Sequence, residues 1–541
     1  MTRRIWASVA MTAIGASLLA AALFAGPAAG GPEASAQRVG GSLTVTSRSD
    51  FDYVDPSLAY FSHSWNMMAA TNLGLMYYPH QEGAASTRLT PMASQGMPRI
   101  SSNGRTYTFT IKQGFRFSNG QPVTAANFAR AFARGLTPAM QSPASSFLDD
   151  VASYRAVNAR TFRVVLERPA GDFLSRMSMQ FFTAVPTNTP IAAEGIKAPV
   201  ISAGPYHIRE WNEGRSALMV RNPHWRNNQE PFRSLGFRNY LNEVRWIVGA
   251  DPATQRLQCE RGEADICSFP PAQAKELADQ YGVNRANGRF FRKQQTGNWY
   301  LAMNTQRPLF ANANLRKAVS HAIDRRFMVA QHGFLAGQRS DQFLPLPMPG
   351  FKQANIYSLR GPNYDRARQL AQGNTGDGKA VFYTFNVSQG PPIAQSVQFN
   401  LQRIGIDVEI RQFDRVVQHE KAATRGEPFD LTLEGWLMDY PDPSNFINVL
   451  LDGRRIQAEN NVNVSYFNNA AIHRQMDRAQ ALTGQARLNA FGDLDINIIR
   501  NHAPVAPYIS SAARVFTSSK VGGFKYTSLQ GTLWTQVFAR S

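Results

Sequence analysis

Apolar and polar residues alternate with a period of two in several short runs along the chain. This period predicts strands, because successive side chains of a strand point to opposite faces of its sheet. The predicted strands cover 39–47, 107–111, 161–167, 206–209, 381–385, 406–410 and 429–434. In the last of them Phe429, Leu431 and Leu433 alternate with polar residues, which places one face of that strand in a core.

Three other segments repeat their apolar residues at helical spacing. The first follows the cap residue Thr124, the second follows the cap residue Asn314, and the third is ended by Gly405. Their apolar positions are Phe128, Ala131 and Phe132; Leu315, Val319, Ala322, Ile323 and Phe327; and Ile393, Val397, Leu401 and Ile404. Because a single glycine leads from the third helix into a predicted strand, we expect an α/β layer with helices packed on a sheet.

The segment GWLMDYPDPSNF, residues 435–446, follows directly on the strand predicted for 429–434. In open α/β sheets, ligands bind beyond the carboxyl ends of the strands. The segment carries Trp436 and two carboxylates, Asp439 and Asp442, at such a position. The residues alone allow three interpretations: a catalytic pair, an anchor for a ligand, or a capped turn.

The length and charge of the chain narrow the class of protein. With 541 residues the chain exceeds what one hydrophobic core accommodates, so we expect at least two lobes. Its 43% hydrophobic and 18% charged residues are typical of a globular protein. The formal net charge is +19, but no block of five like charges occurs. We therefore expect a generally basic surface and no nucleic-acid partner.

The first 36 residues have the order of regions found in secretory signals. Arg3 and Arg4 precede an apolar run over 5–24, and an A-x-A motif ends at Ala36. A membrane anchor is the alternative, since the run approaches the length that spans a bilayer. Its many small residues make it weakly hydrophobic and favour a cleaved signal, by the Sec or the twin-arginine route. We expect a periplasmic mature protein without a lipid anchor, because no cysteine lies near Gln37.

The two cysteines, Cys259 and Cys267, lie eight residues apart. An oxidising compartment would allow them to form a disulfide that staples this short loop. Two free, buried thiols are the alternative. Neither interpretation indicates catalysis, because no histidine lies near them in the sequence.

Several enzyme motifs are incomplete. GNTGDGK has the spacing of a phosphate loop, but Ala380 replaces the hydroxyl that holds magnesium, and a predicted strand follows instead of a helix. His419 and the glutamate after it begin a zinc-protease motif, but Ala423 replaces the second histidine. Asp439 and Asp442 lie in one turn, whereas paired glycosidase carboxylates usually come from different elements. We expect no enzyme, no metal site and no cofactor.

Five segments together resemble the extracytoplasmic solute-binding proteins of ABC importers, in the peptide/nickel-binding class known as family 5. They cover nearly all of the chain after residue 36, in the order expected for that family. The segments are NGRTYTFTIKQGFRFSNGQPVTAANFARAF at 103–132, AGPYHIREW at 203–211 with RNPHW at 221–225, NTQRPLFANANLRKAVSHAIDR at 304–325, IAQSVQFNLQRIGIDVEI at 393–410, and FDLTLEGWLMDYPDPSNF at 429–446.

The resemblance implies an α/β, two-lobed periplasmic-binding-protein fold of type II, in the large cluster with an extra inserted subdomain. A ligand would lie in the cleft between the lobes and be enclosed when they close. After a signal peptide at 1–36, the implied parts are lobe I at 37–76, 204–295 and 513–541, the inserted subdomain at 77–203, and lobe II at 296–512.

The resemblance also implies a ligand site. Peptide-binding members carry a Trp-x-x-Asp motif whose aspartate accepts the ammonium group of the peptide, and this motif falls on Trp436 and Asp439. Trp436 would form an apolar wall, and the backbone of Gly435, Trp436 and Leu437 would pair with the peptide as an added strand. Tyr440 is assigned to the same site. Core packing for Trp436 and a turn cap for Asp439 are the alternatives, and Asp442, between two prolines, is expected to be a turn residue.

The opposite lobe of such proteins contributes the residues shortly after an Asp-Pro pair. Here that pair is Asp55-Pro56, and it indicates Tyr60, Phe61 and Ser62 as ligand contacts.

One departure from the family bears on the ligand. Dipeptide binders present an arginine to the carboxylate of the ligand from the loop after a strand of the second lobe. The comparable stretch, YTFNVSQGPPIAQ from Tyr383, contains none. This argues for longer peptides or another amine-bearing solute. Nickel-binding members tend to lack the aspartate found at Asp439, which argues against a metal ligand.

The resemblance therefore implies the substrate-binding component of an ABC transporter. Such a protein is expected to be a monomer that captures oligopeptides in the periplasm and docks transiently on a permease in the inner membrane. Two alternatives stay open at this point. The same fold could bind a metal chelate, an opine, a sugar or an antibiotic, or the protein could be a ligand sensor that docks on a membrane receptor.

Overall fold

The computed structural model describes residues 39–198, 201–225 and 232–540. The signal peptide expected at 1–36 lies outside these residues. Everything below concerns the compact unit of residues 37–541. Within the described residues, no helix is long and apolar enough to cross a membrane.

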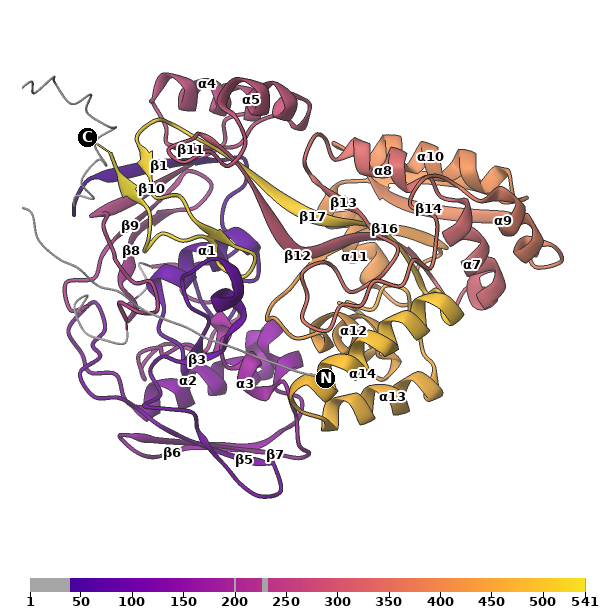
Figure 1. Cartoon of the computed structure of the whole chain (residues 1–541). Coiled ribbons are helices and arrows are strands. Elements are labelled where there is room, and N and C mark those ends of the chain that lie inside the picture. Colours follow the sequence, from indigo (N-terminus) through magenta and orange to yellow (C-terminus); the bar gives the residue numbers. More distant parts are fainter. Residues whose placement is uncertain (1–38, 199–200, 226–231, 541) are drawn as a thin grey trace, which may run out of the picture. The chain divides into compact units, whose positions relative to one another are not determined.

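Eleven strands of the described chain form one mixed sheet, with the order β15-β14-β16-β12-β17-β11-β1-β10-β9-β8 and β13 paired to β17. The two long strands β12 and β17 separate β14–β16 from the strands of the first half of the chain (Figure 1). The bounds are β1 Ser42–Ser47, β8 Tyr206–Asn212, β9 Ser216–Arg221, β10 Glu243–Val248, β11 Ile266–Cys267, β12 Phe290–Met303, β13 Gly337–Arg339, β14 Lys379–Phe385, β15 Asp407–Phe413, β16 Leu431–Leu437 and β17 Val505–Thr517.

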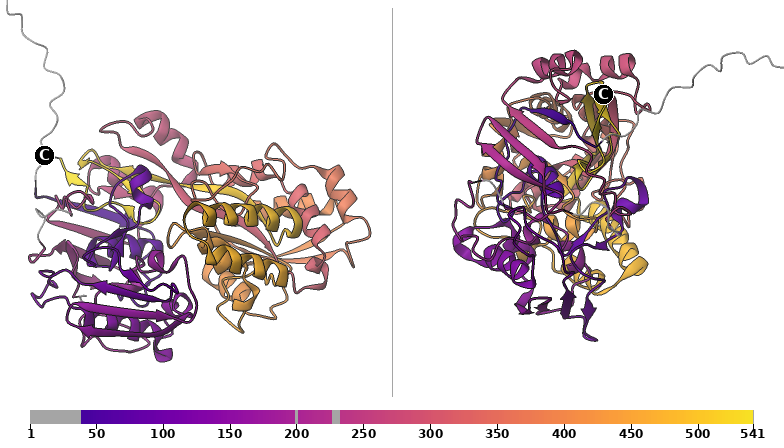
Figure 2. Two further views of the ribbon diagram at one scale, coloured as in Figure 1. Left: turned by 60° about the horizontal axis from the view of Figure 1, so that its bottom comes forward. Right: turned by 90° about the vertical axis from the view of Figure 1, so that its left-hand side faces the viewer.

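A second sheet of four strands belongs to the segment inserted after β2 (Met76–Tyr77), with the order β4-β5-β7-β6. It lies apart from the large sheet (Figure 2). The helix α2 (Ala125–Leu136) covers it. Thr124 is the N-cap of this helix, as predicted, and forms a capping box with Asn127. The strand bounds are β4 Arg99–Ile100, β5 Thr106–Thr110, β6 Val151–Asn158 and β7 Thr161–Leu166.

Helices cover the large sheet, as the α/β prediction requires. Most of the apolar residues predicted for the strands of 381–434, and those of the helix ended by Gly405, are buried together in one cluster, whereas Phe429 is buried in another. The remaining α-helices of the described residues are α1 Ser62–Thr71, α3 Phe173–Arg176, α4 Pro252–Arg261, α5 Ala274–Tyr281, α6 Pro308–Ala311, α7 Ala313–Ala322, α8 Arg325–Gln331, α9 Tyr364–Ala371, α10 Gly390–Gln402, α11 Arg415–Ala423, α12 Ser444–Leu451, α13 Ala470–Ala481 and α14 Gly484–Asn497. The short strands are β3 Thr90–Pro91, β18 Val521–Gly522, β19 Tyr526–Thr527, β20 Gly531–Thr532 and β21 Phe538–Ala539.

The helix predicted after Asn314 differs from the structure at both ends. Its cap is Asn312, whose side chain accepts a hydrogen bond from the amide of residue 314. The helix stops at Ala322, and Asp324 starts a new helix by accepting hydrogen bonds from two amides of α8. Phe327, predicted to be buried, is 42% exposed on that second helix. The Asp324 side chain bonds to amides that would otherwise bond to carbonyls of a continuous helix, so the helix breaks here. The spacing of the apolar residues alone does not reveal this break.

The strand predicted at 429–434 begins two residues later, at Leu431, and continues to Leu437. The three additional residues pair with β12, with Gly435 opposite Trp299 and Leu437 opposite Gly297. On its other side, β14 pairs only with Leu431 and Thr432. Within the described residues, no strand pairs with that edge of β16 beyond residue 432, and the Leu433 carbonyl accepts hydrogen bonds from the Arg415 and Gln418 side chains instead.

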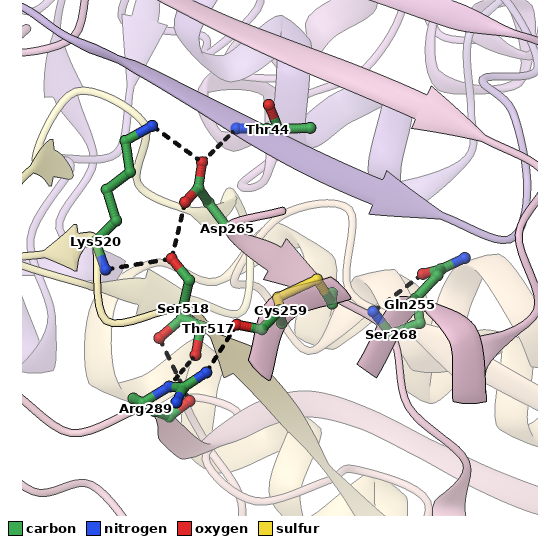
Figure 3. Close-up of a disulfide and its surroundings, with 10 residues drawn as sticks. Thr44, Gln255, Cys259, Asp265, Ser268, Arg289, Thr517, Ser518 and Lys520 are labelled. Atoms are coloured by element: carbon green, nitrogen blue, oxygen red, sulfur yellow. Dashed lines mark hydrogen bonds and ion pairs between the residues drawn. A yellow bond between two sulfur atoms is a disulfide. The ribbon is translucent and has the colours of Figure 1, made fainter. Parts of the chain in front are cut away.

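A disulfide joins Cys259 on α4 to Cys267 on β11 (Figure 3). Next to it, Asp265 accepts hydrogen bonds from the Thr44 amide at 2.8 Å and the Ser518 hydroxyl at 2.8 Å. Arg289 donates to the carbonyl of Cys259 at 2.8 Å. Both cysteines are buried, and together these contacts tie α4 and β11 to β1 and to the carboxyl-terminal segment.

Candidate ligand-binding site

A cavity of about 760 Å³ lies at the carboxyl end of β16. It is formed by the start of α1, by β12, α11 and β16, and by the segment around β19 and β20. Seven of the eight residues predicted for the site line it: Tyr60, Phe61, Ser62, Gly435, Trp436, Leu437 and Asp439. The structure therefore brings the two predicted halves of the site together, although 373 residues separate Ser62 from Gly435 in the sequence.

Asp439 is a buried carboxylate without a cationic partner among the described residues. It is 7% exposed, and its Oδ2 accepts hydrogen bonds from the Tyr60 hydroxyl at 3.1 Å and the Asn445 amide at 2.8 Å. Burial raises the pKa of Asp439 to about 7, since removing a carboxylate from water disfavours its charged form. Tyr60 and Asn445 offset part of this effect. The charge is therefore compensated by a proton or by a cation that enters the cavity.

Asn445 holds the turn that carries Asp439. Its Oδ1 accepts from the Asp439 amide at 2.9 Å and from Nε1 of Trp436 at 3.2 Å, while its Nδ2 donates to the Asp439 carboxylate. Asn445 lies in the first turn of α12 and is fully buried. Sequence analysis missed it. The only local sign in the sequence that Asn445 belongs to the site is its position, six residues after Asp439 and next to the start of a helix.

Tyr60 is held in place from its own side of the cavity. Its amide and that of Phe61 donate to the Asp52 carboxylate at 2.6 and 2.9 Å. Its ring packs against Trp65 and meets Trp436 edge-to-face, with the centroids 6.5 Å apart. Burial and the neighbouring Asp439 raise the pKa of Tyr60 well above its usual value, so its hydroxyl stays protonated and donates to that carboxylate.

A second group of charges lines the cavity near the middle of β16. Glu434 is 3% exposed and pairs with Arg415 and His419 of α11, each at 3.3 Å. Burial would raise the pKa of Glu434, but His419 and Arg415 lower it to about 2. The guanidinium of Arg415 also lies over the Trp299 ring, 5.0 Å from its centroid. Sequence analysis considered His419 only as part of a zinc motif, and it missed Arg415 and Glu434 because their pairing requires the fold.

Tyr440 is the predicted site residue that does not line this cavity. It is 2% exposed, and its hydroxyl donates to Asp172 of the inserted segment at 3.0 Å. The chain turns after Asp439, so consecutive side chains point to different surroundings. Asp442 also lies outside the cavity, where it accepts from the Ser444 amide and pairs with Arg487 at 2.8 Å. The bond from the Ser444 amide is the local role expected of a turn residue, whereas the pair with Arg487 joins the turn to α14.

The described residues contain no group of three or more histidine, cysteine, aspartate or glutamate side chains that could hold a metal ion. The cavity at the carboxyl end of β16 is lined by residues of α1, β12, α11 and β16. It has apolar walls, one unpaired strand edge and one uncompensated carboxylate.

Comparison with known proteins agrees with this architecture. The chain is 25% identical to the probable D,D-dipeptide-binding periplasmic protein DdpA of Escherichia coli strain K12, over 82% of this chain and 84% of that protein. It is 24% identical to the oligopeptide-binding protein OppA of Bacillus subtilis strain 168, over 93% of both chains.

Solved structures show the same two-lobed fold. The clavulanic acid biosynthesis oligopeptide binding protein 2 matches with a TM-score of 0.82 at 22% identity, over 94% of this chain and 96% of that one. The ABC transporter-associated periplasmic binding protein DppA from Helicobacter pylori, in complex with the peptide STSA, matches with a TM-score of 0.78 at 21% identity, over 93% of this chain and 99% of that one. The family model of the bacterial extracellular solute-binding proteins, family 5, matches residues 88–458. This match spans most of the chain, and the protein belongs to that family.

Proposed function

We propose that this protein captures peptides with a free amino terminus and delivers them to the permease of an ABC importer. The observation that carries the proposal is the buried Asp439 carboxylate, which lacks a cationic partner among the described residues and faces a cavity of about 760 Å³. The α-ammonium group of a peptide would compensate this charge with charge-assisted hydrogen bonds.

The main chain of a peptide also finds a partner in this cavity. The edge of β16 at Gly435–Leu437 lacks a neighbouring strand among the described residues on the side away from β12. An extended peptide could pair there as an added strand while its side chains meet Trp436 and Tyr60. A sugar or a metal chelate would use neither this edge nor an amine anchor, so the edge supports a peptide.

The names of the relatives support the remaining parts of the proposal. Two of them are described as binding dipeptides or oligopeptides, and one solved neighbour is described as a periplasmic protein associated with an ABC transporter. We propose the same compartment after cleavage of residues 1–36, a monomer, and a transient complex with the permease. No catalytic activity is proposed.

We also propose that the lobes are 37–76 with 204–295 and 513–541, and 296–512, with 77–203 as the inserted subdomain. The strand order supports this division, because β1 and β8–β11 fall in the first lobe and β14–β16 in the second.

Calorimetry with one pentapeptide in two forms tests the amine anchor. Wild-type protein should bind the free peptide and lose at least about tenfold in affinity when the amino terminus is acetylated, because a hydrogen bond to a buried charge is lost. Asp439→Asn should bind both forms with similar, weak affinity. Asp495→Asn is the matched control, since burial raises the pKa of Asp495 also to about 7 and it does not line the cavity. Equal binding of both forms by wild-type protein would refute the anchor.

The ligand itself can be identified by native mass spectrometry of protein purified from its host. A bound peptide supports the proposal, and an amine-free solute of fixed mass contradicts it.

A further inference from the structure

The four-stranded sheet of the inserted segment carries charge of one sign. One of its faces packs against α2, in a core that includes Phe109 and Phe162. The strands β4, β5, β7 and β6 contain no aspartate or glutamate, and their only charged residues are Arg99, Arg155 and Arg163. Figure 1 shows this sheet at the margin of the molecule.

The strand register places the three arginines in one row across the sheet. Arg99 of β4 lies opposite Thr108 of β5, and Thr108 lies opposite Arg163 of β7. Arg163 in turn lies opposite Arg155 of β6. Residues directly opposite each other in antiparallel strands share a face of the sheet. Because the neighbours of this row in β5 and β7 point into the core, the row belongs to the face turned away from α2.

The positive charge of this row is not compensated within the described chain. None of the three guanidinium groups forms an ion pair or a hydrogen bond with another described residue. Arg155 and Arg163 stand directly opposite each other, where like charges destabilise a sheet. Glu167, the first carboxylate after β7, lies four residues beyond Arg163, roughly 13 Å along the chain. An uncompensated local conflict of this kind favours a functional reason, namely a partner that supplies negative charge.

We propose that this face docks on a surface of anionic phospholipid headgroups. Arginine binds phosphate in a bidentate manner, and hydroxyl groups beside it donate further hydrogen bonds. The net charge of +19 adds a general attraction towards such a surface. The inference does not depend on the proposed peptide site, because the face shares no residue with the cavity at β16. The residues of this arginine face are Arg99, Arg155, Arg163, Thr106, Thr110 and Thr161.

The dimensions of the row fit an array of anions better than a single anion. Neighbouring strands lie roughly 4.8 Å apart, so Arg99 is about 10 Å from Arg163 and about 14 Å from Arg155 across the sheet. One phosphate ion cannot contact all three side chains, whereas a layer of headgroups extends beneath the whole row.

A protein partner fits this face less well. The row crosses the strands, so it does not follow a free strand edge on which another chain could pair. The aromatic residues of the four strands, which would anchor a protein interface, point to the face covered by α2. The arginine face therefore offers charge and hydroxyl groups without an apolar anchor.

Sedimentation with vesicles tests the inference on residues 37–541, which form the compact unit of the chain. The apolar run before them is removed because it could itself enter a bilayer. Wild-type protein should bind vesicles of phosphatidylglycerol and phosphatidylcholine at low salt, and should not bind vesicles of phosphatidylcholine alone. Salt at about 1 M should abolish the binding, since it shortens the screening length to about 3 Å.

Variants of the row give the expected size of the effect. An arginine beside an anionic surface contributes a factor of about five to the partition coefficient. The triple variant Arg99→Gln, Arg155→Gln and Arg163→Gln should therefore lose about 100-fold in partitioning. Arg155→Gln alone, at an exposed position, should lose about fivefold. The triple variant should melt no lower than wild type, because it removes a repulsion between like charges.

A matched control has the same change in net charge at exposed positions on other elements. Its partition coefficient should fall by less than about threefold, because charges far from the docking face are screened. Its substitutions are Arg326→Gln, Arg360→Gln and Arg500→Gln.

The outcomes separate the possible partners of the arginine face. If the two triple variants lose binding equally, the attraction belongs to the net charge of the whole chain and the inference is overturned. It is overturned also if wild-type protein binds neither kind of vesicle. If wild-type protein binds poly-L-glutamate but not the anionic vesicles, the face belongs to an acidic protein segment and the inference is wrong. Peptide binding enters none of these measurements, so failure of the proposed function would leave their result unchanged.

Discussion

The raised pKa of Asp439 makes peptide affinity depend on pH in a way that can be calculated. Only the ionised carboxylate pairs with an ammonium group, and the pKa of Asp439 in the free protein is about 7. A peptide amino terminus has a pKa of about 7.7–8.0, so it is mostly charged at pH 7 and fully charged at pH 5.

The fraction of protein with an ionised Asp439 is about one half at pH 7 and about one hundredth at pH 5. The ratio of ionised to protonated carboxyl falls about tenfold for each unit by which the pH is lowered. The product of the two charged fractions predicts that affinity falls about 40-fold between pH 7 and pH 5. Above pH 8 it falls again as the ammonium group loses its proton. Binding at pH 6 should also release close to one proton from Asp439.

Calorimetry in two buffers of different ionisation enthalpy measures both the affinity and the number of protons released. Asp439→Asn should abolish the loss of peptide affinity between pH 7 and pH 5, the acid limb of the pH profile. Asp495→Asn should keep this loss. The reasoning is wrong if wild-type affinity stays within twofold between pH 5 and pH 7. A 40-fold change that persists in Asp439→Asn would assign the acid limb to another group, such as His419, whose pKa is raised by Glu434.

The same pKa predicts the stability of the ligand-free protein. For an acid whose pKa is higher in the folded state, stability is greatest below the unfolded pKa of 3.8 and declines as pH rises towards about 7. Asp439→Asn should therefore gain stability over wild type as pH rises from 4 to 8, by up to about 4 kcal/mol, measured by urea denaturation at each pH. A difference that does not change with pH would contradict the assigned pKa.

The remaining predictions concern the support of the site and the disulfide. Asp172 accepts hydrogen bonds from Tyr440, Ser444 and Gln480 and pairs with Arg176, so Asp172→Asn should lower the free energy of unfolding by about 2–4 kcal/mol in urea denaturation. Asp149→Asn, which breaks only an exposed ion pair, should change it by less than about 1 kcal/mol. Replacing Cys259 and Cys267 by serine should cost about 2–3 kcal/mol for a separation of eight residues. Reductant should destabilise wild type equally and leave the double variant unchanged.

Local patterns were sufficient for much of the fold. Alternation in 429–434 and helical spacing in 393–404 predicted a buried strand and a buried helix, and Leu431 and Leu433 of the strand share one core cluster with that helix. Thr124 marked the start of its helix, because the capping box joins Thr124 to Asn127, only three residues further along the sequence. Such features depend on neighbours in the sequence, so the sequence displays them directly. The resemblance supplied the two-lobed arrangement, which no local pattern contains.

Other features arose only when distant segments met. β16 reaches Leu437 because β12 pairs with it there, and Phe327 is exposed because Asp324 caps a separate helix. The partners of Asp439 are a tyrosine 379 positions away and an asparagine on the next helix. The pairing of Glu434 with Arg415 and His419 has no trace in the sequence either, since it forms only when α11 packs beside β16.

The sequence by itself determined which residue types line the site, because Trp436, Asp439 and Tyr60 lie in recognisable motifs. The tertiary structure decided which charges are compensated. Compensation depends on burial and on contacts between segments hundreds of residues apart, and these exist only once the chain has folded.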